Sequence, residues 1–260
     1  MSGSRMKKIF DQMNQEGKKI LVAYFPLCDP ALDDQVAWAG KYFANGATVL
    51  EMGLPYENPS LDGKTVQDSM ERALEKHTVD DAFDVIRSLR AAYPDQILQV
   101  MTYYEIIDGM GVKEFARRCA ESGADAVLSP NTPADRGAEL DAALAEHGLF
   151  NLRFAPYHLT DAAEQDLIDH AQGYIFQQAV DGMTGPQKTT SPQAGINAKR
   201  LKSLGITTPV VAGFGISNAQ QVGEMCAMGV DGVVVGSAII TAILEGRGEE
   251  FIKSLREALD

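Results

Sequence analysis

Short apolar runs alternate with amphipathic stretches along almost the whole chain, and this alternation constrains the fold more than any other feature. Eight runs rich in β-branched and aliphatic residues predict strands at 20–25, 48–52, 97–103, 126–129, 151–155, 174–178, 209–212 and 232–235. Strands that alternate with helices form right-handed βαβ units around a parallel sheet. Eight such units in 260 residues favour a single closed (β/α)₈ barrel of the TIM type over an open sheet.

Helical periodicity lies between most of the predicted strands, and four of the helices end just before a glycine, a residue that often follows a helix C-terminus. The helices are predicted at 6–15, 33–45, 66–76, 80–92, 112–122, 134–147, 219–228, 237–244 and 249–259. This pattern places extra helices at the N-terminus, after the second strand and after the eighth. We expect the N-terminal helix to close the bottom of the barrel.

No linker rich in Pro, Gly or Ser divides the chain, so we expect a single barrel domain over residues 6–260. Residues 1–5 precede a second methionine, Met6, and are expected to be a cloning remnant outside that domain.

Composition narrows the function classes. Lys and Arg number 23 and Asp and Glu 36, and the net charge of −13 argues against a nucleic-acid or anionic membrane partner held by bulk charge. The chain has neither an apolar run of about 18 residues nor the pattern of a signal peptide. Its three cysteines, Cys28, Cys119 and Cys226, form no CxxC motif, and its four histidines form no metal-binding cluster. We therefore expect a cytoplasmic protein without a metal site.

Two carboxylates stand at the barrel end where active sites of this fold are built. Glu51 lies in the apolar run VLEMGL near the end of the second predicted strand, and Asp62 follows in the next loop, just before Gly63. A carboxyl group that points into the barrel mouth is partly desolvated, which raises its pKa and suits general acid–base catalysis. The alternatives are a Glu51 that turns outward to pair with a lysine and an Asp62 that only forms a turn.

Glycines follow the seventh and eighth predicted strands, in the segments Gly213-Phe-Gly215 and Gly236-Ser237. Free backbone N–H groups at such loops and at a helix N-terminus bind phosphate, and barrels often place a phosphate site after these two strands. The alternative is a pair of tight turns. The loop after the sixth strand, residues 181–192, is long and polar and predicts a mobile lid, although an ordinary surface loop is the alternative.

Several separate motifs, in one order along the chain, resemble the tryptophan synthase alpha chain family. Residues 51–63, EMGLPYENPSLDG, are similar to the family's usual LELGxPFSDPxADG. Further matches are DP at 29–30, MTYY at 101–104, GMTG at 182–185 and the two glycine loops, so the resemblance covers nearly the whole chain. It implies a barrel that cleaves indole-3-glycerol phosphate, a small phosphorylated indole, to indole and glyceraldehyde 3-phosphate without a cofactor or metal. It also implies a pyridoxal-phosphate-dependent beta chain as partner, in an α2β2 complex.

The resemblance implies a role for each matching residue. Glu51 would carry out both proton transfers, Asp62 would accept a hydrogen bond from the indole N–H, and Thr184 would orient Asp62 when the lid closes. The other residues are implied to hold the two ends of the substrate. Those with backbone N–H groups for the phosphate are Gly185, Gly215, Gly236 and Ser237, and those that line the indole pocket are Tyr24, Tyr103, Phe176 and Phe214.

The chain departs from the family's usual residues mainly in loops around the site. Asn58 stands where an aspartate that touches the beta chain is usual, Glu105 where an asparagine is usual, and Asn131 where an aspartate is usual. Phe176 lacks the usual tyrosine hydroxyl, and Val180 replaces an arginine. These departures bear more on the coupling to a beta chain than on the cleavage reaction itself. Two alternatives stay open: a lyase that works alone on this or a related phosphorylated aldol, and a non-catalytic barrel that binds a phosphorylated ligand or acts on a partner.

Overall fold

The computed structural model describes residues 2–182, 185 and 190–260, and it confirms the predicted barrel. Within the described residues nine parallel strands form one sheet, in the order β5-β4-β3-β2-β1-β9-β8-β7-β6. Their bounds are β1 Ile20–Pro26, β2 Val49–Gly53, β3 Ile97–Met101, β4 Ala126–Leu128, β5 Phe150–Asn151, β6 Arg153–Ala155, β7 Ile175–Gln178, β8 Val210–Gly213 and β9 Gly232–Val235. Because β1 pairs with both β2 and β9, the first and last strands lie side by side and the sheet curls round on itself.

The barrel closes through the segment around Leu152, which the sequence predicts as one strand. β5 pairs with β4 on one side and β6 pairs with β7 on the other, and only Leu152 separates the two short strands. The fifth predicted strand is therefore interrupted rather than continuous. The nine strands occupy eight positions around the barrel, as the sequence predicts.

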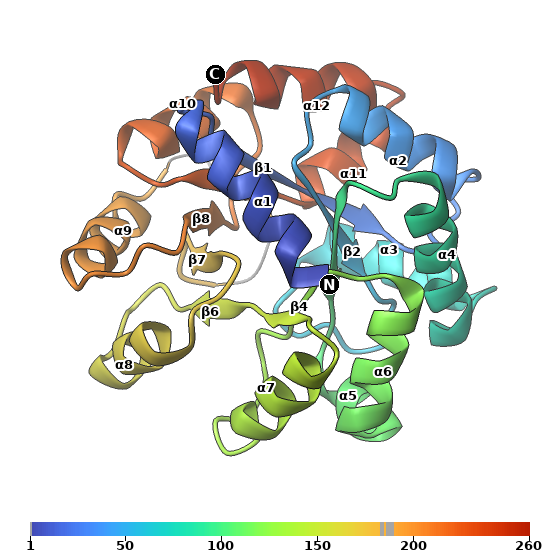
Figure 1. Ribbon diagram of the computed structural model, residues 1–260. Coiled ribbons are helices and arrows are strands. Elements are labelled where there is room, and N and C mark those ends of the chain that lie inside the picture. The colour runs from blue at the N-terminus through green and yellow to red at the C-terminus, as the bar shows by residue number, and fades with distance from the viewer. Residues whose placement is uncertain (1, 183–184, 186–189) are drawn as a thin grey trace.

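Helices surround the strands, and Figure 1 shows them as a ring with α1 lying across one end of the barrel. Their bounds in the described residues are α1 Ser2–Gln15, α2 Gln35–Ala44, α3 Lys64–Leu74, α4 Val79–Ala92, α5 Tyr104–Met110, α6 Val112–Ser122, α7 Gly137–Glu146, α8 Asp161–His170, α9 Gln193–Ser203, α10 Ala219–Ala227, α11 Ser237–Leu244 and α12 Gly248–Glu257. The predicted extra helices are all present, before β1, after β2 and after β9. None of the described helices has the length and apolar character needed to cross a lipid bilayer.

Three helices are missing from the sequence prediction, namely α5, α8 and α9. Helix α5 begins at Tyr104, directly after the predicted third strand, which the sequence pattern extends to Tyr103 although β3 ends at Met101. Helix α8 buries only Glu164 and Leu167, so it lacks a clear apolar stripe. Helix α9 buries mostly small or polar residues, which hides its inner face.

Helix α1 closes the bottom of the barrel, as the sequence predicts. Met6 and Phe10 are buried against the first residues of the strands, and the Phe10 ring meets the Tyr174 ring edge-on with centroids 6.5 Å apart. The helix begins at Ser2, four residues earlier than predicted. Arg5, in this first turn, forms an ion pair with the buried carboxylate of Asp125, which fastens the start of α1 to the loop before β4.

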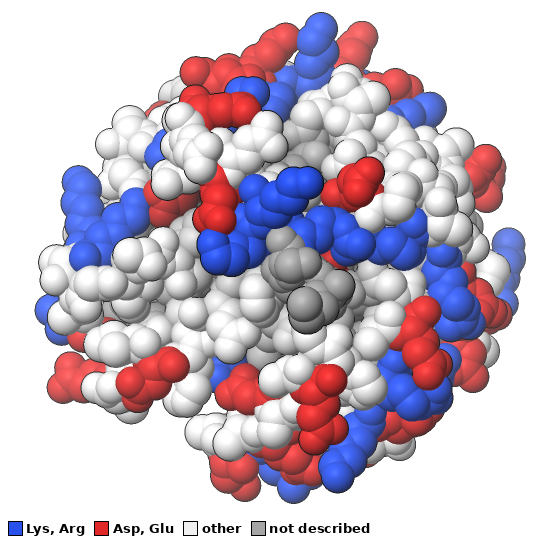
Figure 2. All heavy atoms as spheres, in the orientation of Figure 1, with Lys and Arg blue, Asp and Glu red and all other residues white. Residues whose placement is uncertain are grey.

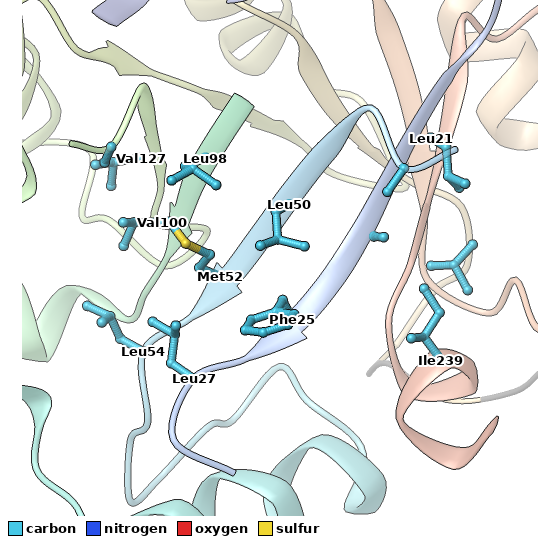
Figure 3. Packing of buried hydrophobic residues seen from close by; sticks show 14 of the residues in the cluster. Leu21, Phe25, Leu27, Leu50, Met52, Leu54, Leu98, Val100, Val127 and Ile239 are labelled. Carbon is cyan, nitrogen blue, oxygen red and sulfur yellow. The ribbon is translucent and has the colours of Figure 1, made fainter. Parts of the chain in front are cut away.

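Alternate residues of each strand face two different cores. One set packs outward against the helices, and Figure 3 shows it for the first strands and α11, with Leu21, Phe25, Leu50, Met52, Leu98, Val100 and Ile239. The other set fills the barrel interior, and it comprises Ile20, Val22, Val49, Ile97, Ala126, Leu128, Tyr174, Phe176, Val211 and Val234. Glu51 is two residues after Val49 and Gln99 is two residues after Ile97. Both polar side chains therefore point into the barrel.

Charged side chains on the face that α1 covers are mixed in sign. Figure 2 shows Lys and Arg across the centre of this face, with Asp and Glu mostly towards its edge. Several of the charges are paired, as Lys7 is with Asp11 at 2.6 Å and Lys202 is with Asp231 at 2.7 Å. The net charge of −13 is thus not spread evenly over the surface.

Candidate active site

Glu51 lies in the middle of β2, and its side chain points into the barrel, where little water reaches it. Its side chain is 4% exposed, and Tyr24 of β1 and Gln99 of β3 are its neighbours in the strand register. Burial raises the pKa of Glu51 to about 7, while the hydrogen bond from Gln99 lowers it and the nearby charge of Asp62 raises it. A carboxyl group with a pKa near neutrality can both give and take a proton at physiological pH.

A chain of buried polar groups reaches Glu51 from the barrel interior. The Tyr174 hydroxyl donates to Oε1 of Gln99 at 2.6 Å, and Nε2 of Gln99 donates to Oε1 of Glu51 at 3.2 Å. Both Gln99 and Tyr174 are fully buried. Neither residue is predicted from the sequence as part of the site, although a glutamine at an inward position of an otherwise apolar strand is a visible signal.

Asp62 is held in place from the loop after β3. The Tyr103 hydroxyl donates to Oδ2 of Asp62 at 2.8 Å and accepts a hydrogen bond from the Leu61 amide at 3.1 Å. Nε2 of Gln67, in the first turns of α3, donates to the backbone carbonyl of Asp62 at 2.7 Å. Tyr56 stacks on the Tyr103 ring with centroids 5.2 Å apart. Asp62 is thus a buried, anchored carboxylate and not merely a residue in a turn.

Helix α3, which follows the Asp62 loop, is fixed to the loop after β1 by a buried carboxylate. Asp29 is 1% exposed and accepts hydrogen bonds from Nε and Nη2 of Arg72, at 3.0 and 2.7 Å, and from the Ser69 hydroxyl. The match of Asp29 to the family motif therefore has a structural reason. It ties the segment that carries Asp62 to the barrel wall.

Glycines border the site at the ends of β8 and β9. Phe214 and Gly215 both have positive φ angles, +76° and +79°, so the chain makes a left-handed turn directly after β8. This conformation is costly for a phenylalanine, and strain of this kind collects at functional sites. Gly236 precedes α11 as its N-cap, and Ser237 is the first residue of that helix. The first N–H groups of a helix lack partners within the helix and attract anions.

Three phenylalanine rings form an apolar wall of the site. Phe154 of β6 stacks on Phe176 of β7 with centroids 5.5 Å apart, and Phe214 contacts both rings at 6.0 and 5.5 Å. Phe154 is not among the residues predicted from the sequence. It follows the interruption at Leu152, which shifts the alternation along the fifth predicted strand, so the pattern could not place it.

The long loop after β7 is described only in part, and Thr184 lies outside the described residues. The described ends of the loop are tied to the loop after β6. Gln178 accepts from the Tyr157 amide at 3.1 Å and donates to the Gly182 carbonyl at 3.0 Å, and the Tyr157 hydroxyl is 2.9 Å from that of Ser191.

One pocket brings most of the predicted residues together. Both carboxylates line it, as do the predicted glycines and Ser237, and the whole predicted set in its wall is Tyr24, Glu51, Asp62, Phe176, Gly185, Phe214, Gly215, Gly236 and Ser237. Tyr103 is not in the wall, because it lies fully buried behind Asp62. The Tyr24 hydroxyl is buried and has no hydrogen-bond partner among the described residues. The pocket therefore has an acidic end, an apolar wall and a glycine-lined end.

Two of the departures noted in the sequence contact each other. Nδ2 of Asn131 donates to Oε2 of Glu105 at 2.9 Å, and Oδ1 of Asn131 accepts from the Tyr104 amide at 2.8 Å. A carboxylate and an amide still form a pair here, with their positions exchanged relative to the usual residues. Glu57 and Asn58 are exposed on the rim of a surface groove between the β2 loop and α3.

Comparison with known proteins gives one consistent result. A family model described as tryptophan synthase alpha chain matches residues 10–258. The tryptophan synthase alpha chain of Archaeoglobus fulgidus is 33% identical over 241 residues, which cover 92% of this chain and 96% of that protein. The one from Corynebacterium glutamicum is 32% identical over 243 residues, which cover 92% of this chain and 86% of that protein.

Solved structures agree with this result. A structure of Mycobacterium tuberculosis tryptophan synthase superimposes with a TM-score of 0.89 at 26% identity, over 98% of both chains. A crystal structure of tryptophan synthase subunit alpha from Legionella pneumophila matches with a TM-score of 0.86 at 26% identity, again over 98% of both chains.

Proposed function

The chain belongs to the tryptophan synthase alpha chain family, and on this basis we propose which of its residues carry the reaction. As a member it is a lyase of tryptophan biosynthesis that cleaves indole-3-glycerol phosphate. The cleavage is a retro-aldol reaction that yields indole and glyceraldehyde 3-phosphate. The observation that most supports our assignment is the buried Glu51, whose pKa is raised to about 7, in one pocket with Asp62.

Glu51 acts as the acid and then as the base. In its protonated form it gives a proton to C3 of the indole ring, which turns the ring into a leaving group with a positive charge. The ionised Glu51 then takes the proton of the glycerol hydroxyl next to that carbon. The O–H electrons form the new carbonyl, and the C–C bond electrons return to the ring. Glu51 ends protonated, as it began, so no other acid or base is required.

Asp62 stabilises the charged ring. Its carboxylate accepts a hydrogen bond from the indole N–H, where positive charge develops after C3 is protonated. The Tyr103 hydroxyl at 2.8 Å holds one carboxylate oxygen, so the carboxylate is oriented before the substrate arrives. Two carboxylates with separate tasks, one titrating near neutrality and one fixed by hydrogen bonds, suit a reaction that needs both a proton carrier and a counter-charge.

The glycine-lined end of the pocket binds the phosphate. Backbone N–H groups of Gly185, Gly215, Gly236 and Ser237 are the proposed donors, and the N-terminus of α11 adds the favourable helix dipole. The indole ring lies against the apolar wall formed by Phe176 and its neighbours. The position of Tyr103 behind Asp62 supports an orienting role for it in place of the pocket-lining role implied by the resemblance.

Replacement of Glu51 tests the catalytic assignment. Glu51→Gln keeps the shape of the side chain but cannot carry a proton, and general acid–base catalysis contributes about 10²–10⁴-fold. We expect indole release to fall by that factor while glycerol phosphate still binds in calorimetry. A variant that keeps more than a tenth of the activity would exclude Glu51 as the proton carrier.

Replacement of Gly236 tests the phosphate site independently. An added Cβ would meet its nearest neighbour, Cβ of Tyr24, at 3.5 Å, which is an ordinary contact, so Gly236→Ala is expected to fold. Gly236→Val places more bulk where the phosphate binds and should raise the substrate KM steeply. Inorganic phosphate that binds with unchanged affinity to both variants would place the phosphate elsewhere.

A beta chain is the proposed partner, in an α2β2 complex. Relatives and solved structures that bear the name tryptophan synthase support this partner. Three cysteines without disulfides, Cys28, Cys119 and Cys226, support a reducing, cytoplasmic location.

A further inference from the structure

Inside the barrel, two buried polar side chains form a hydrogen-bonded network with Glu51, and the reaction steps above give them no role. Tyr174, Gln99 and Glu51 come from three different strands or strand ends, and each is at most 4% exposed. The Tyr174 hydroxyl donates to the side-chain oxygen Oε1 of Gln99 at 2.6 Å, and the side-chain nitrogen Nε2 of Gln99 donates to Oε1 of Glu51 at 3.2 Å. Two polar side chains buried in an apolar interior cost folding energy unless they are hydrogen-bonded, so their presence needs an explanation.

Gln99 has a donor at one end of its amide and an acceptor at the other, and Tyr174 has a hydroxyl that can donate or accept. With Glu51 ionised, the NH₂ group faces the carboxylate, and the tyrosine donates to the amide oxygen. With Glu51 protonated on the oxygen that faces the pocket, Oε1 is a carbonyl oxygen and still accepts from the Gln99 NH₂ group. The hydrogen bonds between Tyr174, Gln99 and Glu51 are therefore kept in both protonation states.

We propose that Gln99 and Tyr174 are positioning residues that keep the carboxyl group of Glu51 hydrogen-bonded through one oxygen in both of its protonation states, and leave the other oxygen for the substrate. The inference rests on the proposed role of Glu51 as the proton carrier. A group that is an acid in one step and a base in the next gains from surroundings that satisfy both forms, since neither form is then left unpaired in a dry interior.

Among the described residues, four elements place titratable or polar groups around Glu51. They contribute Tyr24 from β1, Asp62 from the loop after β2, Gln99 from β3 and Tyr174 immediately before β7. Asp62 opposes ionisation of Glu51, and burial does so more strongly. Gln99 is the group that favours the ionised form. Removal of its NH₂ group should therefore shift the balance towards protonated Glu51.

The test is a direct titration of Glu51 in two variants. The carboxyl signal is followed by infrared or ¹³C NMR spectroscopy as a difference from Glu51→Gln, and the pH profile of kcat is measured in parallel. Gln99→Met removes the amide at similar volume. Hydrogen bonds to charged groups are worth enough to move the titration midpoint of Glu51 upward by about 1–2 pH units. Tyr174→Phe leaves the amide unoriented and should move it upward by less.

Two matched controls separate this effect from a general disturbance of the core. Gln177→Met alters a fully buried glutamine whose amide donates only to backbone carbonyls among the described residues. Tyr42→Phe removes a buried hydroxyl that has no hydrogen-bond partner among the described residues. Both controls should leave the Glu51 midpoint in place.

The outcomes distinguish this inference from the proposed function. An unchanged midpoint in both Gln99→Met and Tyr174→Phe would overturn the positioning role, even if Glu51→Gln is inactive. A shifted midpoint would support the positioning role, even if Glu51→Gln stays active and the catalytic role of Glu51 fails. If Gln99→Met does not fold, Tyr174→Phe decides the question, because it removes a single oxygen atom.

Discussion

Tyr103 and Asp62 are joined by a 2.8 Å hydrogen bond from the tyrosine hydroxyl to Oδ2 of the carboxylate, and the same hydroxyl accepts from the amide of Leu61. One fully buried side chain thus fixes both the carboxylate and the backbone that leads to it. The loop that carries Asp62 is long, and its position depends on this contact across to the end of β3. The orientation of Asp62 is therefore set by the strand next to the one that carries Glu51.

Tyr103→Phe should weaken catalysis more than it weakens the fold. The variant loses a hydrogen bond to the charged Asp62 carboxylate and so orients it less firmly, and we expect kcat/KM to fall by about 10- to 100-fold. Stability should fall by about 1–2 kcal/mol. Steady-state indole release and urea unfolding measure the two effects. Tyr56→Phe is the control, since it keeps the ring that stacks on Tyr103. Full activity in Tyr103→Phe would contradict the orienting role.

Gly213→Ala should displace the Phe176 ring from the apolar wall. An added Cβ would lie 2.3 Å from Cζ of Phe176, a distance that real contacts do not reach, and the ring is held by its two phenylalanine neighbours. Overpacking of this kind costs about 1–3 kcal/mol. We expect a lower melting temperature and a raised KM for the substrate.

A smaller side chain at position 176 should restore the stability that Gly213→Ala loses. Gly213→Ala combined with Phe176→Leu is expected to regain most of the lost stability. Gly223→Ala is the matched control, because a Cβ there meets nothing within 4 Å and the helix α10 should gain up to about 1 kcal/mol. Equal losses of stability in Gly213→Ala and in the double variant would show that the Phe176 ring is not the cause.

The barrel could be predicted from the sequence because its signals are local. Eight apolar runs, the glycines after helices and the extra helices at three places each depend on residues close together in the chain. The interruption at Leu152 could not be predicted in this way, because β5 and β6 are defined by which neighbour each pairs with. Helices α8 and α9 were not predicted because the residues on their buried faces are few, small or polar, which gives little hydrophobic periodicity.

The site was predictable only where a residue stands in a recognisable motif. Glu51, Asp62 and the glycine loops were found from strand-end positions and family-like motifs, and the structure places them around one pocket. Gln99, Tyr174 and Phe154 were missed because their roles depend on contacts across the barrel. The partner of Gln99 is 48 residues away in one direction and 75 in the other. The spacing of residues along the chain does not predict contacts of this kind.

Glu51→Gln should stabilise the protein at alkaline pH while it abolishes activity. The pKa of Glu51 is about 7 in the folded chain and 4.5 at its ordinary value, so the folded state binds a proton that the unfolded state releases between these values. The stability that this proton provides is fully present below pH 4.5 and is lost as the pH rises through 7. Above that pH the glutamine should be more stable by about 3 kcal/mol.

Urea unfolding at pH 4.5 and pH 8 measures this effect. The two proteins should unfold at similar urea concentrations at pH 4.5, and the variant should unfold at a higher concentration at pH 8. Glu146→Gln, at an exposed position of α7, is the control. A difference between Glu51→Gln and the parent chain that is equal at both pH values would show that burial does not raise the Glu51 pKa.

The rim of the β2 loop should decide which beta chains activate this lyase. Glu57 and Asn58 are exposed, and they stand where the family's motif usually has serine and aspartate. A change of charges at an interface rim alters partner choice and association rate more than it alters the fold.

We expect a beta chain from the same source to stimulate indole formation and one of typical sequence to do so poorly. Glu57→Ser with Asn58→Asp restores the usual residues and should raise the second response, whereas Glu146→Ser should not. Equal stimulation of the parent chain by both partners would show that this rim does not set specificity, and no stimulation by either would favour a lyase that works alone.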